Sequence, residues 1–343
     1  LVGSEMCIRD RTDSDPELNV DGNIWNHYPS VPIQIGGIFR NILNPFAVLK
    51  GIAFSWFGTY VRGLFLGLIV LFWFTIFPEM EEISQGLGLW IFEIYAINLG
   101  LMFAWTGGLH LYFYTFHIQN RFLEYDVNNM QTGNKFKFGD QVWDNMFWSL
   151  TSSLTIWTVY ECGFLWLWSQ GIIPKWNWDD GVIWFIALFI LIPFWDSLHF
   201  YVVHRVLHWK WIYKYVHSVH HRNINVGPWS GMSMHPIEGA IYLSVILIHL
   251  ILPSHPLHIA FHISWYALGP AATHCGFEAV SIAGGKYPRL GDFFHQLHHR
   301  FFECNYGNSD VPLDSLSNTF HDGTRAGTRK MRERMKLQRK LRE

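Results

Sequence analysis

The chain has 343 residues, half of them hydrophobic and only 15% charged, with a formal net charge of −2. Soluble domains carry roughly 25% charged residues, so this composition argues against an ordinary soluble protein. Residues 1–11, LVGSEMCIRDR, resemble a translated sequencing adapter and are left out of the fold prediction. Residues 12–59 mix polar and apolar residues, and we expect a cytoplasmic segment that leads to the first membrane span.

Long apolar runs indicate the fold class. Residues 60–198 hold four such runs, at 63–78, 86–118, 145–170 and 181–195. A helix that spans a bilayer needs about 20 apolar residues, so each run predicts a transmembrane helix. Two shorter runs, 237–252 and 256–273, meet at Pro-Ser-His-Pro and predict either thin spans or a re-entrant hairpin within 237–273. The expected fold is therefore an all-α, polytopic membrane bundle of four long spans and a shorter hairpin.

The distribution of basic residues predicts the orientation. The segment after the second run carries Arg121, Lys135 and Lys137, whereas the opposite connection at 79–85 has no Lys or Arg. By the positive-inside rule, the face that follows the second and fourth runs is cytoplasmic, with both termini on that side.

Histidines are concentrated on this predicted cytoplasmic face. Two of them are four residues apart, which places both rings on one side of a helix. Two further groups have the pattern H-x-x-H-H, which covers an arc of about 100° on a helix. These eight histidines are His204, His208, His217, His220, His221, His295, His298 and His299. Imidazole suits Fe, Zn, Cu and Ni, so the eight rings could supply four ligands to each of two ions.

The spacing of the first five histidines predicts a bend. His208 and His217 are nine residues apart, about half a turn out of phase on a straight helix. If all five rings meet at one metal centre, the chain must turn between them, around residues 209–213. A single histidine near a membrane surface is usually a polar packing residue, but three groups on one face favour a metal site.

The order of these motifs resembles the fatty acid hydroxylase/sterol desaturase superfamily of membrane diiron enzymes. The resemblance lies in WDSLHFYVVHRVLH, HSVHHRN and FFHQLHHRFFECNYG, with looser agreement to Asp314, and it covers roughly the last 40% of the chain. It implies a His-rich catalytic cap over 199–323 that holds two iron ions. Such enzymes use O2 and electrons from a separate donor (a cytochrome, ferredoxin or reductase) to hydroxylate or desaturate a membrane lipid. The motif THCGFE implies that His274 joins the metal ligands.

Some residues around the motifs have two interpretations. His199 is an additional histidine that the family pattern lacks, and Leu313 stands where tryptophan is expected. One set could orient ligand rings or act as an extra ligand, with helix capping or structural packing as the alternative: His199, His235, Asp196, Glu238 and Glu278. Another set is expected to hydrogen-bond the cap: Asn305, Tyr306 and Asp314.

Other functions are compatible with clustered histidines. A His-rich metal transporter should place its ligands near the bilayer midplane, and a zinc hydrolase normally needs three protein ligands and an open position. Imidazole ligands alone do not distinguish iron from zinc.

The C-terminal tail and the cysteines give little further indication of function. Residues 324–343 contain nine Lys/Arg and two Glu, typical of a topology signal or of an amphipathic helix on anionic lipid; nucleic-acid binding is not expected. The four cysteines form no CxxC pair. Neither the oligomeric state nor the identity of the lipid follows from the sequence.

Overall fold

The computed structural model describes residues 25–54, 59–282, 285–286 and 288–340, so the predicted adapter segment 1–11 lies outside the described residues. Within the described residues the chain forms helices and isolated β-bridges but no strands. The predicted all-α class is therefore confirmed.

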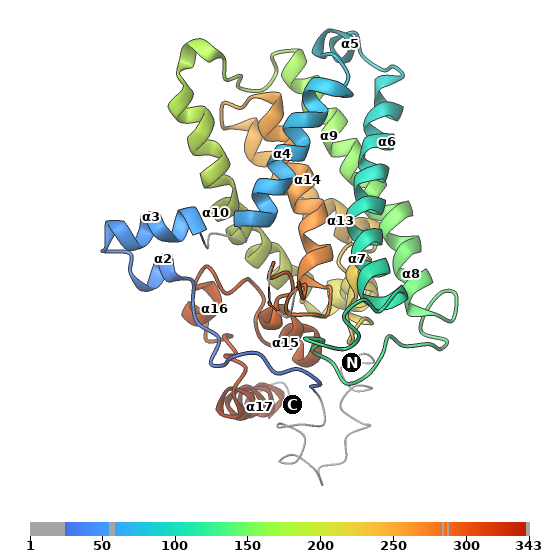
Figure 1. Cartoon of the computed structure of the whole chain (residues 1–343), viewed down its shortest axis with the longest axis vertical. Helices are drawn as coiled ribbons and strands as arrows, with labels where there is room; N and C mark the ends of the chain where they lie inside the picture. The colour runs from blue at the N-terminus through green and yellow to red at the C-terminus, as the bar shows by residue number, and fades with distance from the viewer. Residues whose placement is uncertain (1–24, 55–58, 283–284, 287, 341–343) are drawn as a thin grey trace.

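Long helical rods run side by side along the long axis of the molecule (Figure 1). Several of them are continuous helices that include π-helical or 3-10 segments. The rods are α4 (Thr59–Thr75); α6 (Trp90–Met102), η2 (Phe103–Gly107), α7 (Gly108–His110) and η3 (Leu111–Thr115); α8 (Gln141–Trp148), η4 (Ser149–Ser153) and α9 (Leu154–Ser169); α10 (Val182–Leu207); α13 (Pro236–Leu243) and η8 (Ser244–Leu250); and α14 (Pro256–Thr273).

Short helices lie at the two ends of these rods. They are α2 (Gly37–Arg40), α3 (Pro45–Phe54), α5 (Met80–Ser84), η5 (Trp178–Asp180), α11 (Lys210–Ile212), η6 (Tyr213–His217), α12 (Ser218–His221), η7 (Pro228–Ser230), α15 (Phe293–Phe301), α16 (Leu313–Leu316) and α17 (Arg325–Lys340).

Local sequence signals explain where the rods begin. The Asp140 carboxylate accepts hydrogen bonds from the backbone N–H groups of Val142 and Trp143, at 2.8 and 3.1 Å, and so caps α8. Gly181 has φ of +88°, which lets the chain turn sharply into α10. Pro236 and Pro256 begin α13 and α14, where a missing N–H costs nothing.

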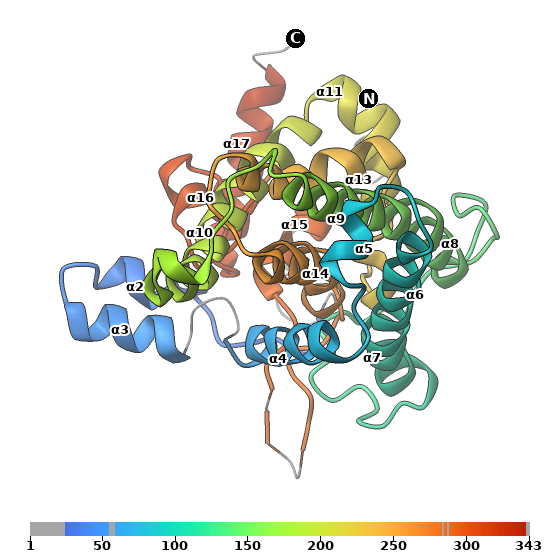
Figure 2. The same ribbon diagram turned by 90° about the horizontal axis from the view of Figure 1, so that it is seen from above.

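Helix α14 occupies the centre of the bundle (Figure 2). It packs against α4, α9 and α10. Ile259, Phe261, Ile263 and Leu268, on different sides of the helix, are all at most 1% exposed. A helix that is hydrophobic all round is expected to be buried on all sides. Of the predicted hairpin 237–273, the second half, α14, is therefore part of the interior of the bundle.

Two helices have the length and apolar composition needed to cross a membrane, Trp90–Thr115 and Val182–Leu207. At 1.5 Å per residue, 26 residues extend about 39 Å. The apolar helices Tyr60–Thr75 and Pro236–Leu250 are shorter. The four-span topology therefore stays a prediction.

The two ends of the bundle carry different elements. Helix α5 lies at one end, and α15, α16 and α17 lie at the other, which also receives the C-terminal end of α10 (Figure 1). We call the part formed by residues 208–235 and 274–323 the cap. The N-terminal segment also joins the cap, because the ring of Trp25 lies 4.9 Å from the ring of Phe293. All three predicted histidine groups meet at this end.

Candidate metal centre

Nine histidines gather in two groups, eight of them in the cap and the ninth, His204, in the last turn of α10. Within each group, the nitrogens available for a metal lie within 4.8 Å of one another. The first group is His204, His208, His217, His221 and His298, and the second group is His220, His274, His295 and His299. These nine are the histidines for which the sequence predicted a common site.

The bend predicted from the spacing is confirmed. Helix α10 ends at Leu207, and His208 is its C-cap. Trp209 is extended, with φ of −65° and ψ of 136°, and a new helix begins at Lys210. This turn brings His217 and His221 back to His204 and His208, with ring centroids 4.8–6.1 Å apart for the four pairs across the turn.

The distribution of ligands differs from the expected four and four. The eight motif histidines divide into five and three, and His274 is the fourth member of the second group. In H-x-x-H-H the first and last positions are about 40° apart on a helix, whereas the middle histidine is about 60° away on the other side. Accordingly His217 and His221 share one group while His220 joins the other, and α15 repeats the arrangement in reverse.

Hydrogen bonds to backbone carbonyls fix the tautomer of at least four of the nine rings, and a buried carboxyl group contacts a fifth. The Nδ1 of His204 donates to the Tyr306 carbonyl at 2.7 Å, and the Nδ1 of His298 donates to the Cys304 carbonyl at 2.6 Å. In the second group, the Nδ1 atoms of His274 and His299 donate to the carbonyls of Pro270 and Asn223, at 2.9 and 3.0 Å. The fifth ring is that of His217, whose Nδ1 lies 2.7 Å from the Glu238 carboxylate. A neutral imidazole that donates through Nδ1 keeps a lone pair on Nε2.

These lone pairs converge. The Nε2 atoms of His274, His295 and His299 lie 3.1 Å from one another. The Nε2 atoms of His208, His221 and His298 lie 3.1–3.2 Å apart. Because neither His274 nor His299 has a proton on Nε2, their 3.1 Å contact is not a hydrogen bond. A cation between the rings would remove the repulsion between the facing Nε2 lone pairs. Because the lone pairs converge at two places, one in each group, the donor set fits two metal ions.

Burial keeps the rings of the cap neutral. It lowers the pKa of His220 to about 4. It also lowers the pKa of His295, His298 and His299 well below the usual value, with neighbouring imidazoles as a second cause. Since a neutral imidazole is the form that binds a metal, the cap prepares its ligands before any ion arrives.

The loop after α15 supports the first group. The Asp314 carboxylate accepts hydrogen bonds from the backbone N–H groups of Tyr306 and Gly307, at 2.9 and 2.7 Å. Asn305, with φ of +54°, donates from its side-chain amide to the carbonyls of Phe294 and His321. These contacts fix the Tyr306 carbonyl, which in turn orients His204.

Four of the additional predicted residues lie outside both groups. His199 contacts the hydroxyls of Ser244 and Tyr266, at 3.0 and 3.3 Å, and His235 is the N-cap of α13. Asp196 pairs with His262 at 2.7 Å, and Glu278 pairs with His27 at 2.5 Å. Of the acidic candidates, only Glu238 contacts a histidine of either group.

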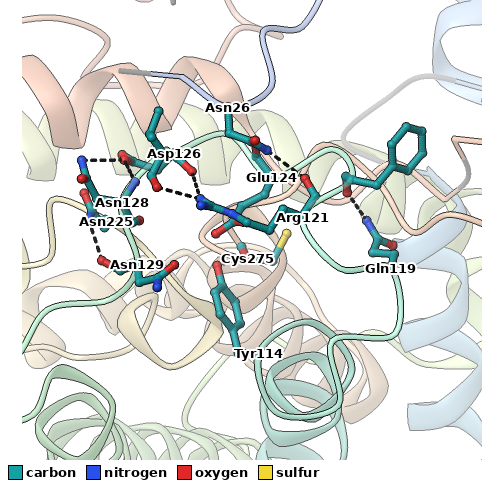
Figure 3. A network of polar contacts seen from close by, with 12 residues as sticks. Asn26, Tyr114, Gln119, Arg121, Glu124, Asp126, Asn128, Asn129, Asn225 and Cys275 are labelled. Atoms are coloured by element: carbon teal, nitrogen blue, oxygen red, sulfur yellow. Dashed lines mark hydrogen bonds and ion pairs between the residues drawn. The ribbon is translucent and has the colours of Figure 1, made fainter. Parts of the chain in front are cut away.

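A polar network holds the segment 114–129 against the chain that carries His274 (Figure 3). The Arg121 guanidinium donates to Glu124 at 2.5 Å and to the Asp126 carbonyl at 2.6 Å. The hydroxyl of Tyr114 donates to the Cys275 carbonyl at 2.8 Å, next to His274. Sequence reasoning did not identify this network.

The residues that orient the ligands were also missed, because most of them act through backbone carbonyls. Every residue has a carbonyl, so Pro270, Asn223 and Cys304 carry no sequence signal for this role. Only the position of Asn223, immediately after the HSVHHR segment, could have suggested it.

Residues 188–319 match the family model described as fatty acid hydroxylase. The chain is 29% identical over 162 residues to a Delta(7)-sterol-C5(6)-desaturase of Nicotiana tabacum, covering 45% of this chain and 56% of the relative. It is 31% identical over 145 residues to the Delta(7)-sterol 5(6)-desaturase ERG3 of Candida albicans, covering 41% and 35%. The corresponding Saccharomyces cerevisiae protein is 29% identical over 147 residues, covering 41% and 38%.

The chain thus spans between about a third and just over half of the length of these relatives. No solved structure matches it. The matched region contains all nine histidines of the two groups. The region 188–319 belongs to the fatty acid hydroxylase/sterol desaturase superfamily.

Proposed function

We propose that this chain is an O2-dependent diiron oxidoreductase that hydroxylates or desaturates an unactivated C–H bond of a membrane lipid, a sterol, a fatty acyl chain or a related molecule. The observation that carries the proposal is the convergence of nine imidazoles in two groups at one end of an apolar helical bundle. The similarity to sterol desaturases supports the reaction class.

In this proposal the two groups would each hold one iron ion, which together supply O2 activation with electrons from a separate donor protein. The chain itself fixes the geometry. Carbonyls of Tyr306, Cys304, Pro270 and Asn223 hold four ligand rings in the Nδ1–H tautomer, so that Nε2 faces the metal position. Glu238, which is 1% exposed, would accept from Nδ1 of His217 and hold that ring in the same tautomer.

Burial of the ligands also limits access by water. Eight of the nine rings are buried, and His208 is the one with intermediate exposure. A site closed in this way protects reactive species from bulk solvent. We propose that electrons enter from the cap side, and that the lipid reaches the centre from the bundle.

The number of donors favours this function over the alternatives. A catalytic zinc normally has three protein ligands, whereas the first group offers five. A transporter would be expected to place its ligands near the middle of the bilayer, whereas the groups lie at the C-terminal ends of α10 and α14.

We further propose that the chain is a multi-pass membrane protein with residues 60–198 forming spans, residues 199–323 forming the catalytic cap around the hairpin 237–273, and residues 324–343 forming a basic tail. The cap would face the cytoplasm, at a bacterial inner membrane or the endoplasmic reticulum. The basic residues around the histidine segments support this orientation.

The experiment that tests the function combines metal analysis with lipidomics. The full chain is expressed in a host and compared with His299→Ala, and the purified protein is reconstituted with iron, O2, a reductant and host lipid. We expect about two iron ions per chain and a lipid product, hydroxylated or with a new double bond, that is absent from the variant.

A protein that contains two zinc ions and stays inactive after reconstitution with iron would overturn the proposal. The variant His235→Ala serves as a matched control, because His235 lies outside both groups and caps α13. It should keep the metal content and the lipid product.

A further inference from the structure

A groove outside the metal centre runs between α4, α10 and α14. It has a volume of about 420 Å³, and its wall is formed by Leu66 and Val70, Phe185 and Phe189, and Leu257 and Phe261. The neighbouring outer surface is apolar, since Leu64, Leu71 and Ile186 are 50–54% exposed. The groove is therefore suited to hydrocarbon that enters sideways from a bilayer.

One end of this apolar groove is polar. Arg62 lines the groove, although it is only 8% exposed. Its Nη1 atom has no hydrogen-bond partner in the described part of the chain. A buried donor without a partner is destabilising, so this atom points to a ligand.

A second unpartnered atom lies on the facing helix. Asp196 follows Phe189 by seven residues, two turns along the same face of α10. It lies within electrostatic range of Arg62. Its Oδ2 atom is buried and has no partner among the described residues.

The other carboxylate oxygen of Asp196 is held from the interior. Oδ1 lies 2.7 Å from Nε2 of His262, whose Nδ1 lies 2.9 Å from His249. His249 is in turn 2.6 Å from the hydroxyl of Ser254. This chain of contacts fixes the Asp196 carboxylate and leaves Oδ2 for a ligand.

We infer that the groove binds a membrane lipid alcohol, with its hydroxyl between Arg62 and Asp196 and its hydrocarbon along α4, α10 and α14. A hydroxyl accepts a hydrogen bond from Nη1 and donates one to Oδ2, so one group satisfies both atoms. A carboxylate would be repelled by Asp196 and by Asp310, which is also in range of Arg62. An ammonium group would be repelled by Arg62.

This site is separate from the metal centre. On α10, the apolar wall of the groove ends at Ile190, about 21 Å before His204, and Asp196 lies eight residues before His204, about 12 Å at 1.5 Å per residue. The inference therefore does not depend on the proposed reaction, and it can be tested without measuring activity.

The test uses photoactivatable probes on the purified full chain in lipid nanodiscs. Three diazirine-bearing probes of equal length are compared: a long-chain alcohol, the corresponding carboxylic acid and the corresponding alkane. We expect the alcohol to label peptides that contain residues 62–70 and 185–190, with competition by unlabelled alcohol. The acid and the alkane should label them about tenfold less, because they lack the paired hydrogen bonds.

Two variants on α4 form a matched pair. Gly63 lines the groove, and a Cβ atom added there meets no protein atom within 4 Å, so a larger side chain would extend into the groove. A Cβ atom at Gly67 also meets nothing within 4 Å, but Gly67 does not line the groove. We expect Gly63→Leu to reduce labelling by the alcohol about tenfold and Gly67→Leu to leave it unchanged. Arg62→Met should reduce labelling by the alcohol to the level of the alkane.

Equal labelling by all three probes would show ordinary bilayer lipid only and would overturn the inference, as would undiminished labelling of Gly63→Leu. The variant His298→Ala, which removes a proposed metal ligand, should keep full labelling of the groove. Loss of activity in His298→Ala with intact labelling would support both proposals, and intact activity with intact labelling would reject only the proposed function.

Discussion

At the level of single residues, helix geometry decides which ring belongs to which metal position. In both H-x-x-H-H motifs the rings four residues apart stay together, and the middle ring joins the other group. Each of α12 and α15 therefore contributes to both positions. We expect the two positions to be coupled, so that loss of one ligand weakens both.

This coupling predicts the behaviour of ligand variants. His217→Ala or His298→Ala should abolish activity and reduce the metal content by at least one ion per chain, because each removes one of the convergent Nε2 donors. Membrane insertion should persist, since neither residue lies in the apolar bundle. Metal analysis of membrane-extracted protein checks this, and a variant with full metal content and activity would contradict the ligand assignment.

Glu238 gives a second prediction at this scale. Its carboxylate lies 2.7 Å from the Nδ1 of His217, and both side chains are at most 2% exposed. Residues that orient a metal ligand typically contribute 10–100-fold to metal affinity. Glu238→Ala should therefore weaken metal binding by about 10–100-fold, measured by competition with a chelator.

A conservative variant of Glu238 separates its hydrogen bond to His217 from its negative charge. Glu238→Gln keeps an oxygen that can accept the proton of His217 and should recover most of the affinity. Equal losses in the alanine and glutamine variants would show that the negative charge, and not the hydrogen bond, sustains the site.

At the level of elements, α15 is positioned by a close approach of two backbones. A Cβ atom at Gly291 would lie 2.0 Å from the Phe277 carbonyl oxygen. Glycine is therefore required where the chain enters α15, the helix that carries His295, His298 and His299. The sequence predicted the helix and its histidines but contained no sign of this contact, since Phe277 lies 14 residues earlier.

The close approach of Gly291 to Phe277 predicts that a substitution at Gly291 disturbs the metal centre without removing a ligand. Gly291→Ala should destabilise the fold by about 1–3 kcal/mol, the usual cost of overpacking, and should lower the metal content by displacing α15. Thermal unfolding and metal analysis of the same preparation check both effects. Gly269→Ala in α14, where a Cβ meets nothing within 4 Å, should change neither quantity.

At the level of the whole molecule, the cap and α5 lie at opposite ends of the bundle (Figure 1). If the bundle crosses a membrane as proposed, the two ends face different compartments. The described cysteines Cys162, Cys275 and Cys304 are buried, so single engineered cysteines can report the orientation once Cys7 is replaced by serine.

The predicted outcome is labelling from opposite sides. Glu81→Cys in α5 should react with a membrane-impermeant maleimide from the side opposite to Lys330→Cys in α17. Because the cap carries the basic segments, the α17 site should be cytoplasmic. Labelling of both sites from the same side would reject the multi-pass orientation.

Apart from His274, which came from the family resemblance, the sequence by itself determined the all-α class, the positions of the long helices, the other eight histidines and the bend after His208. These features depend on local periodicity and on spacing along one helix, which are properties of neighbouring residues. The identity of the family followed from the same motifs.

Only the tertiary structure decided the division of the ligands into five and four, the carbonyls that fix their tautomers, and the pairing of Asp196 with His262 instead of a ligand. It also brought Arg62, which lines an apolar groove, within electrostatic range of Asp196. Each of these depends on the distance between segments far apart in the chain. Helical periodicity fixes the face on which a side chain lies, but the packing of the bundle decides what that face meets.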